Sequence, residues 1–394
     1  MKLVDSLHYH TRDLSAFLIN YQGGFVRRGL GGEIVYRLSA LFSCDPKVII
    51  IPFNTACTFL LVALFVYWFR KRHLCWYVLP LEIFLGCAWF IQWPAIMDST
   101  LMLLFILMLY LFNSLHRNAL RIVCITIVML FTLNLHEASV YFCFPVMFLL
   151  LWNDNKTTKT GVLFFSLFTA TMLVLISKFH GDQSTVDAIH ASWGDVFNEE
   201  PTRFDFAESL SWSFFDTAQM HIHRNFGSPT YLPSAISFLQ LYLKGFYIRP
   251  FVLLLIYYVM TNTVFVFRRN DSSLNLQDRK NICYLMTFQF LSLILMFTIL
   301  SCDWVRVVCY WTLSSYAIFL MVDRKTIDGA FPEWYKRLVW RLDRWLIRLV
   351  SPKKGVVAVC LLVVCITPIH FRPTIAFDYS VVGRIMEMIC HFLS

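Results

Sequence analysis

Long apolar stretches alternate with short polar ones along almost the whole of this chain. An α-helix needs about 20 mainly apolar residues to cross a bilayer. The pattern therefore predicts an all-α fold, a polytopic integral membrane bundle with about ten transmembrane helices. We place these spans at residues 48–69, 75–93, 98–115, 119–135, 138–152, 160–177, 250–267, 281–300, 306–322 and 355–370. The amphipathic stretch 30–43 is too short for a span, and we expect it to lie in the interface or to re-enter the membrane.

Composition extends this prediction to the whole chain. Of the 394 residues, 58% are hydrophobic and only 15% are charged, whereas soluble domains are about 25% charged. We therefore expect residues 1–394 to form a single integral membrane domain. The first twenty residues lack an apolar core, so no cleavable signal peptide is expected. The net charge of +9 lies mostly in the loops, which indicates anchoring at the membrane surface, and no nucleic acid is expected as a partner.

The cysteines do not change this picture. Most of the 12 cysteines lie inside apolar stretches, and no CxxC pair is present. Buried free cysteine behaves as a small hydrophobic residue. We expect no metal site, no disulfide framework and no cofactor.

The distribution of lysine and arginine among the loops predicts the orientation of the chain in the membrane. More than half of the 34 basic residues lie in the short loops after spans one, three, five, seven and nine, and such loops are cytoplasmic. The largest of these segments is 323–354. Within it, residues 333–349 predict a basic amphipathic helix that lies on the inner leaflet as a surface anchor.

The opposite side receives the N-terminal arm, several tight turns and one long loop, 178–249. Loops of that length in compact proteins are usually functional. We expect this loop to be partly helical, with interfacial helices at 207–219 and 233–246.

Four polar islands interrupt the apolar pattern, and the predicted topology places all of them on this outer side. Ionisable residues at the ends of apolar segments are candidate functional residues. The islands are the segment 23–30 (Gly-Gly-Phe-Val-Arg-Arg-Gly-Leu), Asp98, the pair His136-Glu137, and the segment 303–306 (Asp-Trp-Val-Arg).

Two islands carry arginines. Arg27 and Arg28 lie between glycines, which let the backbone approach an anion, and guanidinium groups bind phosphate bidentately. They predict a pyrophosphate clamp, or else contacts with lipid head groups. Asp303 and Arg306 are one helical turn apart. They form either a structural ion pair or a site in which Arg306 binds phosphate or a sugar hydroxyl and Asp303 orients it.

The remaining two islands carry acids. In the pair His136-Glu137, a carboxylate whose pKa is raised by partial desolvation can act as a general base. The alternative is a polar turn between two helices. Asp98 is either an N-cap of the third span or a second catalytic carboxylate.

The long loop adds His221, His223 and Arg224. Histidines at i and i+2 do not share a helix face, so a metal pair on a helix is not expected. Contact with an acceptor sugar, base catalysis and a plain solvated loop remain open for these residues.

Together, the Gly-Gly-Phe-Val-Arg-Arg-Gly-Leu segment, Asp98, His136-Glu137 and the Asp-Trp-Val-Arg segment resemble the polytopic proteins of bacterial surface-polysaccharide clusters. The chain is similar to O-antigen and capsule repeat-unit polymerases of the Wzy type and, more distantly, to GT-C glycosyltransferases. The length, the 38 phenylalanines and the long outer loop also fit this class. GT-C enzymes carry a catalytic acid in the first outer loop, and here Glu33 or Asp5 would have to serve.

The resemblance implies a glycosyltransferase in the bacterial inner membrane with its active face in the periplasm. An undecaprenyl-pyrophosphate-linked oligosaccharide would be the donor and a second lipid-linked repeat unit the acceptor. His136, Glu137, Asp98 and Asp303 would be catalytic. The substrate-binding residues would be Arg27, Arg28, Arg306, His221, His223 and Arg224. Membrane lipids and a chain-length regulator protein are the implied partners.

Several further classes of membrane protein remain open. A transporter or flippase would place charges near the membrane midplane, often in repeated halves, whereas these charges lie at helix ends. A GT-C enzyme that uses a polyprenyl-phosphate sugar, a membrane acyltransferase and a scaffold without enzymatic activity also remain possible for this chain.

Overall fold

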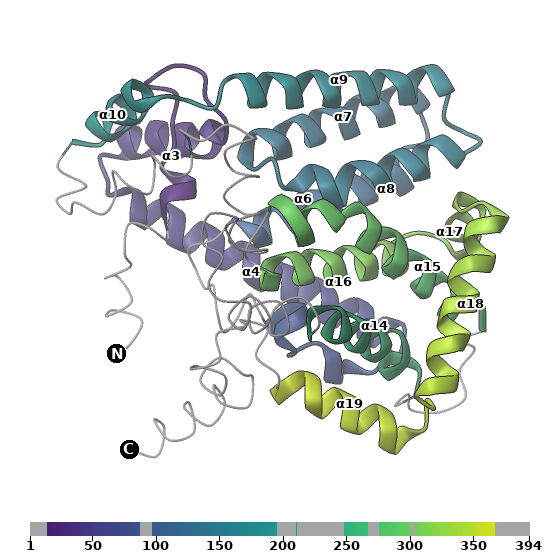
Figure 1. Ribbon diagram of the computed structural model, residues 1–394. Coiled ribbons are helices and arrows are strands. Elements are labelled where there is room, and N and C mark those ends of the chain that lie inside the picture. Colours follow the sequence, from purple (N-terminus) through teal and green to yellow (C-terminus); the bar gives the residue numbers. More distant parts are fainter. Residues whose placement is uncertain are drawn as a thin grey trace, which may run out of the picture. The chain divides into compact units, whose positions relative to one another are not determined.

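The computed structural model describes residues 14–86, 97–194, 210, 248–266, 276–300 and 304–366 (Figure 1). Every regular element in these ranges is a helix, which confirms the all-α class for this part of the chain. Three helices are long and apolar enough to cross a membrane: α4 (Pro46–Lys71), α7 (Asn118–Leu135) and α9 (Lys159–Lys178). Five apolar helices are shorter, so the number of about ten spans stays a prediction.

The chain divides into two compact units, one of residues Met1–Leu61 and Gln92–Thr217, the other of Val62–Ile91 and Ala218–Ser394. The boundary falls within α4. Each unit is described by itself below, and the single membrane domain expected for residues 1–394 stays a prediction.

In the first unit, four helices run side by side (Figure 1). They are α6 (Asp98–Ser114), α7, α8 (Ser139–Asn153) and α9. Because short turns connect them, they alternate in direction, so α6 and α8 begin at the end of the bundle where α7 and α9 finish. Three further helices lie at this end: η1 (Ser15–Phe17), α3 (Gly29–Phe42) and α10 (Gln183–Ser192).

The helix ends have local causes. The Thr158 side chain accepts a hydrogen bond from the Gly161 N–H at 3.2 Å and caps α9, and Asp182 accepts one from the Thr185 N–H at 2.8 Å and caps α10. Such caps satisfy backbone N–H groups that a helix leaves unpaired. The stretch 30–43 corresponds to α3, and its place in the interface or as a re-entrant segment stays a prediction.

Helix α3 packs very closely on the segment that precedes it. A Cβ on Gly32 would overlap the carbonyl oxygen of Ile19 and lie 2.8 Å from the Ile19 nitrogen.

We expect Gly32→Ala to lower the free energy of unfolding by about 1–3 kcal/mol, because the backbone must move to make room for the added Cβ. Thermal unfolding of the detergent-purified protein measures this. The control is Gly329→Ala, since a Cβ there meets no atom within 4 Å; equal unfolding temperatures for both variants would contradict the close packing.

The second unit contains α14 (Ile248–Val266), α15 (Leu276–Ser292), α16 (Trp304–Met321) and α19 (Lys354–Ile366). Its core is aromatic, with Trp311 and Tyr316 buried. The Trp311 indole N–H donates to the Met286 carbonyl at 2.6 Å and fixes α16 on α15.

Two predicted spans of this unit are not continuous helices. Within 75–93, the described residues form two short pieces, η2 (Trp76–Val78) and η3 (Glu82–Gly86). Pro80 between them lacks an N–H donor and breaks the helix, which a hydropathy average does not register. Within 281–300, α15 ends at Ser292 and a separate π-helical turn, η6 (Met296–Leu300), follows.

The basic segment forms α17 (Arg324–Ala330) and α18 (Glu333–Leu349), so the helix predicted at 333–349 is confirmed. One face of α18 is buried, and one charge pair ties α18, and another ties α17, to the start of α15. Arg279 donates two hydrogen bonds to Asp343, at 2.8 and 2.9 Å, and Arg324 pairs with the buried Asp278 at 2.7 Å. The role of surface anchor stays a prediction.

Candidate functional site

The arginine island forms the turn that leads into α3. The Arg27 N–H donates to the carbonyl oxygen of Phe179, at the end of α9, at 2.9 Å. Arg28 is the N-cap residue of α3 and has a left-handed backbone, with φ 63°. A residue other than glycine is strained there, and such strain collects at functional sites. The turn therefore holds two adjacent arginines in a fixed position at the α9 end.

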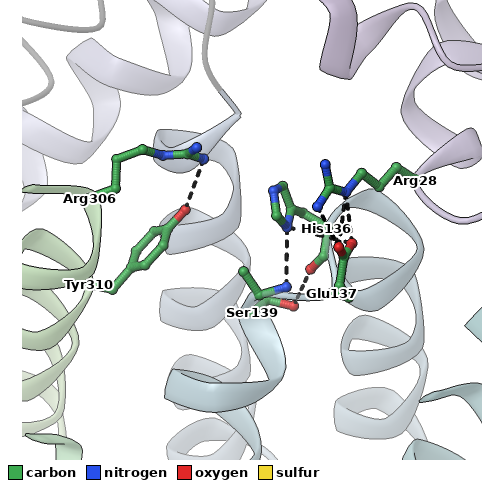
Figure 2. Close-up of polar contacts among 7 residues, drawn as sticks. Arg28, His136, Glu137, Ser139, Arg306 and Tyr310 are labelled. Atoms are coloured by element: carbon green, nitrogen blue, oxygen red, sulfur yellow. Dashed lines mark hydrogen bonds and ion pairs between the residues drawn. The ribbon is translucent and has the colours of Figure 1, made fainter. Parts of the chain in front are cut away.

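The His136-Glu137 island is the turn between α7 and α8. The Ala138 N–H donates to Nδ1 of His136 at 3.1 Å, and the Ser139 hydroxyl donates to the His136 carbonyl at 2.8 Å (Figure 2). Because Nδ1 accepts a hydrogen bond, the neutral imidazole carries its proton on Nε2. Neutral His136 is therefore a donor at Nε2.

These two islands, 109 residues apart in the chain, meet in a bidentate ion pair. The Nε atom of Arg28 donates to both carboxylate oxygens of Glu137, at 2.8 and 3.1 Å, and Nη2 donates to Oε1 (Figure 2). The two side chains are 21% and 26% exposed. The structure brings these two islands together, and their place on the outer face of a membrane stays a prediction.

The electrostatics differ from the sequence-based expectation. Burial acts to raise the pKa of Glu137, but Arg28, His136 in its protonated form and Arg27 outweigh it and hold that pKa well below its usual range. Burial lowers the pKa of Arg27 to about 10, with Glu137 acting against the shift and Arg28 adding to it. Arg27 is thus charged and Glu137 is ionised at neutral pH. The expectation that desolvation raises the pKa of Glu137 was wrong.

Asp98 also lies at this end of the first unit. It is the first residue of α6, whose N-cap is Met97, so Asp98 is not the N-cap itself. A carboxylate in the first turn stabilises the helix dipole. A Cβ on Gly31 would lie 2.9 Å from the Met97 side chain and 3.3 Å from that of Leu135. The start of α6, the end of α7 and the start of α3 are therefore in contact.

Glu33, which the resemblance offered as a catalytic acid, anchors the same turn. It accepts hydrogen bonds from the Tyr21 N–H at 3.1 Å, from Gln22 at 3.2 Å and from Arg37 at 2.7 Å. Burial acts to raise its pKa, and these hydrogen bonds lower it below the usual value. Glu33 is thus an ionised carboxylate that holds Tyr21 and Gln22 in place. Sequence reasoning missed this role because hydropathy carries no sign of a loop folding back on a helix.

The remaining predicted site residues divide into two groups. Arg306 lies in the first turn of α16, in the second unit, and donates to the Tyr310 hydroxyl at 3.5 Å (Figure 2). Asp303, His221, His223, Arg224 and Asp5 lie outside the described residues. The pairing of Asp303 with Arg306 and the roles of the loop residues therefore stay predictions.

Among the described residues, no group of three or more histidine, cysteine, aspartate or glutamate side chains is arranged to hold a metal ion. In the first unit, Arg27, Arg28, His136 and Glu137 form a cluster. It provides two guanidinium groups, an imidazole N–H and one carboxylate that an arginine already binds. This arrangement has one excess positive charge and favours binding of an anionic group. No protein-family model, curated protein or solved structure matches this chain.

Proposed function

We propose that this protein is a membrane glycosyltransferase that polymerises lipid-linked oligosaccharide repeat units at the periplasmic face of the bacterial inner membrane. The observation that supports this most is the meeting of the Arg27-Arg28 turn with the His136-Glu137 turn through the Arg28–Glu137 pair. Donors for such a reaction carry a pyrophosphate group, and the cluster has the charge and the donors to bind one.

Arg28 can bind Glu137 and a pyrophosphate at the same time. Its pair with Glu137 uses Nε and Nη2. A guanidinium group has five N–H donors in a planar fork, so the edge formed by Nη1 and Nη2 is a second bidentate face. Figure 2 shows one terminal nitrogen of Arg28 pointing away from Glu137. In this proposal, Glu137 orients Arg28 and does not act as the base.

The reaction follows from these roles. The acceptor hydroxyl attacks the anomeric carbon of the donor sugar, the bond from that carbon to the pyrophosphate oxygen breaks, and the leaving group gains negative charge. Arg27, Arg28 and the Nε2–H of His136 stabilise that charge, which is the interaction that lowers the barrier most in reactions of this kind. The hydroxyl proton passes to a carboxylate, and among the described residues we assign this role to Asp98.

Activity of the purified protein tests the proposal. Reconstituted with an undecaprenyl-pyrophosphate-linked repeat unit, the protein should form chains of increasing length, and it should do so in the presence of a chelator, because guanidinium groups supply the charge that a metal would otherwise provide. Gel separation of the products measures this. Activity that is lost in chelator and restored by a divalent cation would favour a metal-dependent GT-C enzyme, and transport of an intact lipid-linked unit without chain growth would favour a flippase.

A further inference from the structure

The second unit contains an apolar groove that the proposed reaction does not use. It is formed by α14, α15, η6, α16 and α18, and its cavity volume is about 470 Å³. Leu253 of α14, Phe290 of α15, Ile294 between α15 and η6, Phe297 of η6 and Trp345 of α18 are among the residues that line it. We call it the α14–α18 groove.

The polar groups of this groove already have partners. The Thr298 hydroxyl donates to the Ile294 carbonyl at 2.7 Å, and the Trp311 indole N–H donates to the Met286 carbonyl. The Tyr257 side chain interacts with those of Thr287 and Cys283. A polar ligand would lose its hydration without gaining these groups as partners, so the groove suits a hydrocarbon chain.

Helix α18 adds charge beside the groove. It runs across the ends of α15 and α16 instead of alongside them (Figure 1). Its surface carries an exposed apolar stripe, of which Trp345 is 53% exposed and Leu342 is 48% exposed. Both line the groove. Arg341 and Arg348 are exposed one helical turn before and one after Trp345, so they flank a residue that lines the groove.

We propose that the α14–α18 groove binds one hydrocarbon chain of an anionic phospholipid, with Arg341 and Arg348 binding its phosphate. The size of the groove excludes a transmembrane helix of a partner protein, since a helix with its side chains is about 10–12 Å across, whereas pockets of about 300–1,000 Å³ hold a small ligand. Hydrocarbon in a bilayer is already out of water, so the preference for this lipid arises from its charge.

Lipid binding to the full-length protein in detergent tests this proposal. Native mass spectrometry during titration with phosphatidylglycerol should show one bound lipid that phosphatidylcholine does not replace. Because each basic residue near an anionic surface contributes about 1 kcal/mol, Arg341→Gln with Arg348→Gln should weaken binding about 30-fold. The matched control, Lys353→Gln with Lys354→Gln, removes the same charge from exposed positions outside α18, and it should retain the lipid.

A second pair of variants tests the groove itself. Leu253→Trp fills the groove and should abolish retention with every arginine in place, whereas Phe251→Trp, on the same helix at a residue 70% exposed, should not. Thermal unfolding shows that each variant is folded. Equal retention of both lipids, retention by Leu253→Trp, or displacement of phosphatidylglycerol by undecaprenyl pyrophosphate at an equal concentration would overturn the proposal.

Discussion

Replacing Arg28 with lysine is expected to reduce polymerisation about 30- to 1,000-fold, equivalent to about 2–4 kcal/mol of transition-state stabilisation. Lysine keeps the positive charge but is a point charge, so it cannot bind Glu137 on one edge and pyrophosphate on the other. Both residues have a Cβ and meet the same strain at φ 63°, so the comparison isolates the guanidinium fork. In cells, the product should be a single repeat unit in place of a ladder of chain lengths.

The matched control for this variant is Arg37→Lys. Arg37 also pairs with a glutamate, Glu33, but its side chain is 73% exposed. Exposed pairs of this kind contribute little, and a normal ladder is expected. Protein abundance is measured in parallel for both variants. A normal ladder from Arg28→Lys at normal abundance would remove Arg28 from the site.

Replacing Arg279 with alanine is expected to lower the free energy of unfolding by about 3–5 kcal/mol. Its partner, Asp343, has a side chain that is only 2% exposed, and burial raises the pKa of Asp343 while Arg279 counteracts that shift. Without Arg279, the carboxylate would be buried without its partner cation. Thermal unfolding in detergent measures the effect.

Two further variants define the cause of this loss. Glu333→Ala removes the ion pair with Lys336, in which the Glu333 side chain is 71% exposed, and it should cost less than about 1 kcal/mol. The double variant Arg279→Met with Asp343→Leu replaces both charges by apolar groups and should recover most of the lost stability. If the double variant is as unstable as Arg279→Ala, the buried charge is not the cause.

Much of the helical structure of both units follows from sequence patterns that depend only on local order. The span predicted at 119–135 corresponds to α7 (Asn118–Leu135) and the helix predicted at 333–349 to α18, because apolar length and periodicity mark helices directly. Alternating spans also place the ends of α7 and α9 beside the starts of α6 and α8. The sequence could therefore predict that the Arg28 and Glu137 islands lie near each other.

The sequence could not predict which of these side chains pair with each other. His136 is adjacent to Glu137 in the sequence and suggested a catalytic pair, whereas the strongest partner of Glu137 is Arg28. That contact depends on the turn between residues 19 and 29, whose course is fixed by Glu33 and by close packing at Gly32. Hydropathy likewise assigned 281–300 to one span, since it does not reveal that α15 ends at Ser292 and that η6 follows as a separate turn.

A charge swap at positions 28 and 137 tests the central claim that this pair belongs to an anion-binding site. Arg28→Glu and Glu137→Arg, each alone, place like charges together and should lower both stability and activity. Combined, they restore an ion pair between the same positions without changing the net charge, and thermal unfolding should return close to that of the native protein. The guanidinium group would then extend from the α7–α8 turn instead of lying beside Arg27, so we predict that the polymer ladder is not restored. A ladder restored together with stability would show that the pair is only structural, and it would contradict this account.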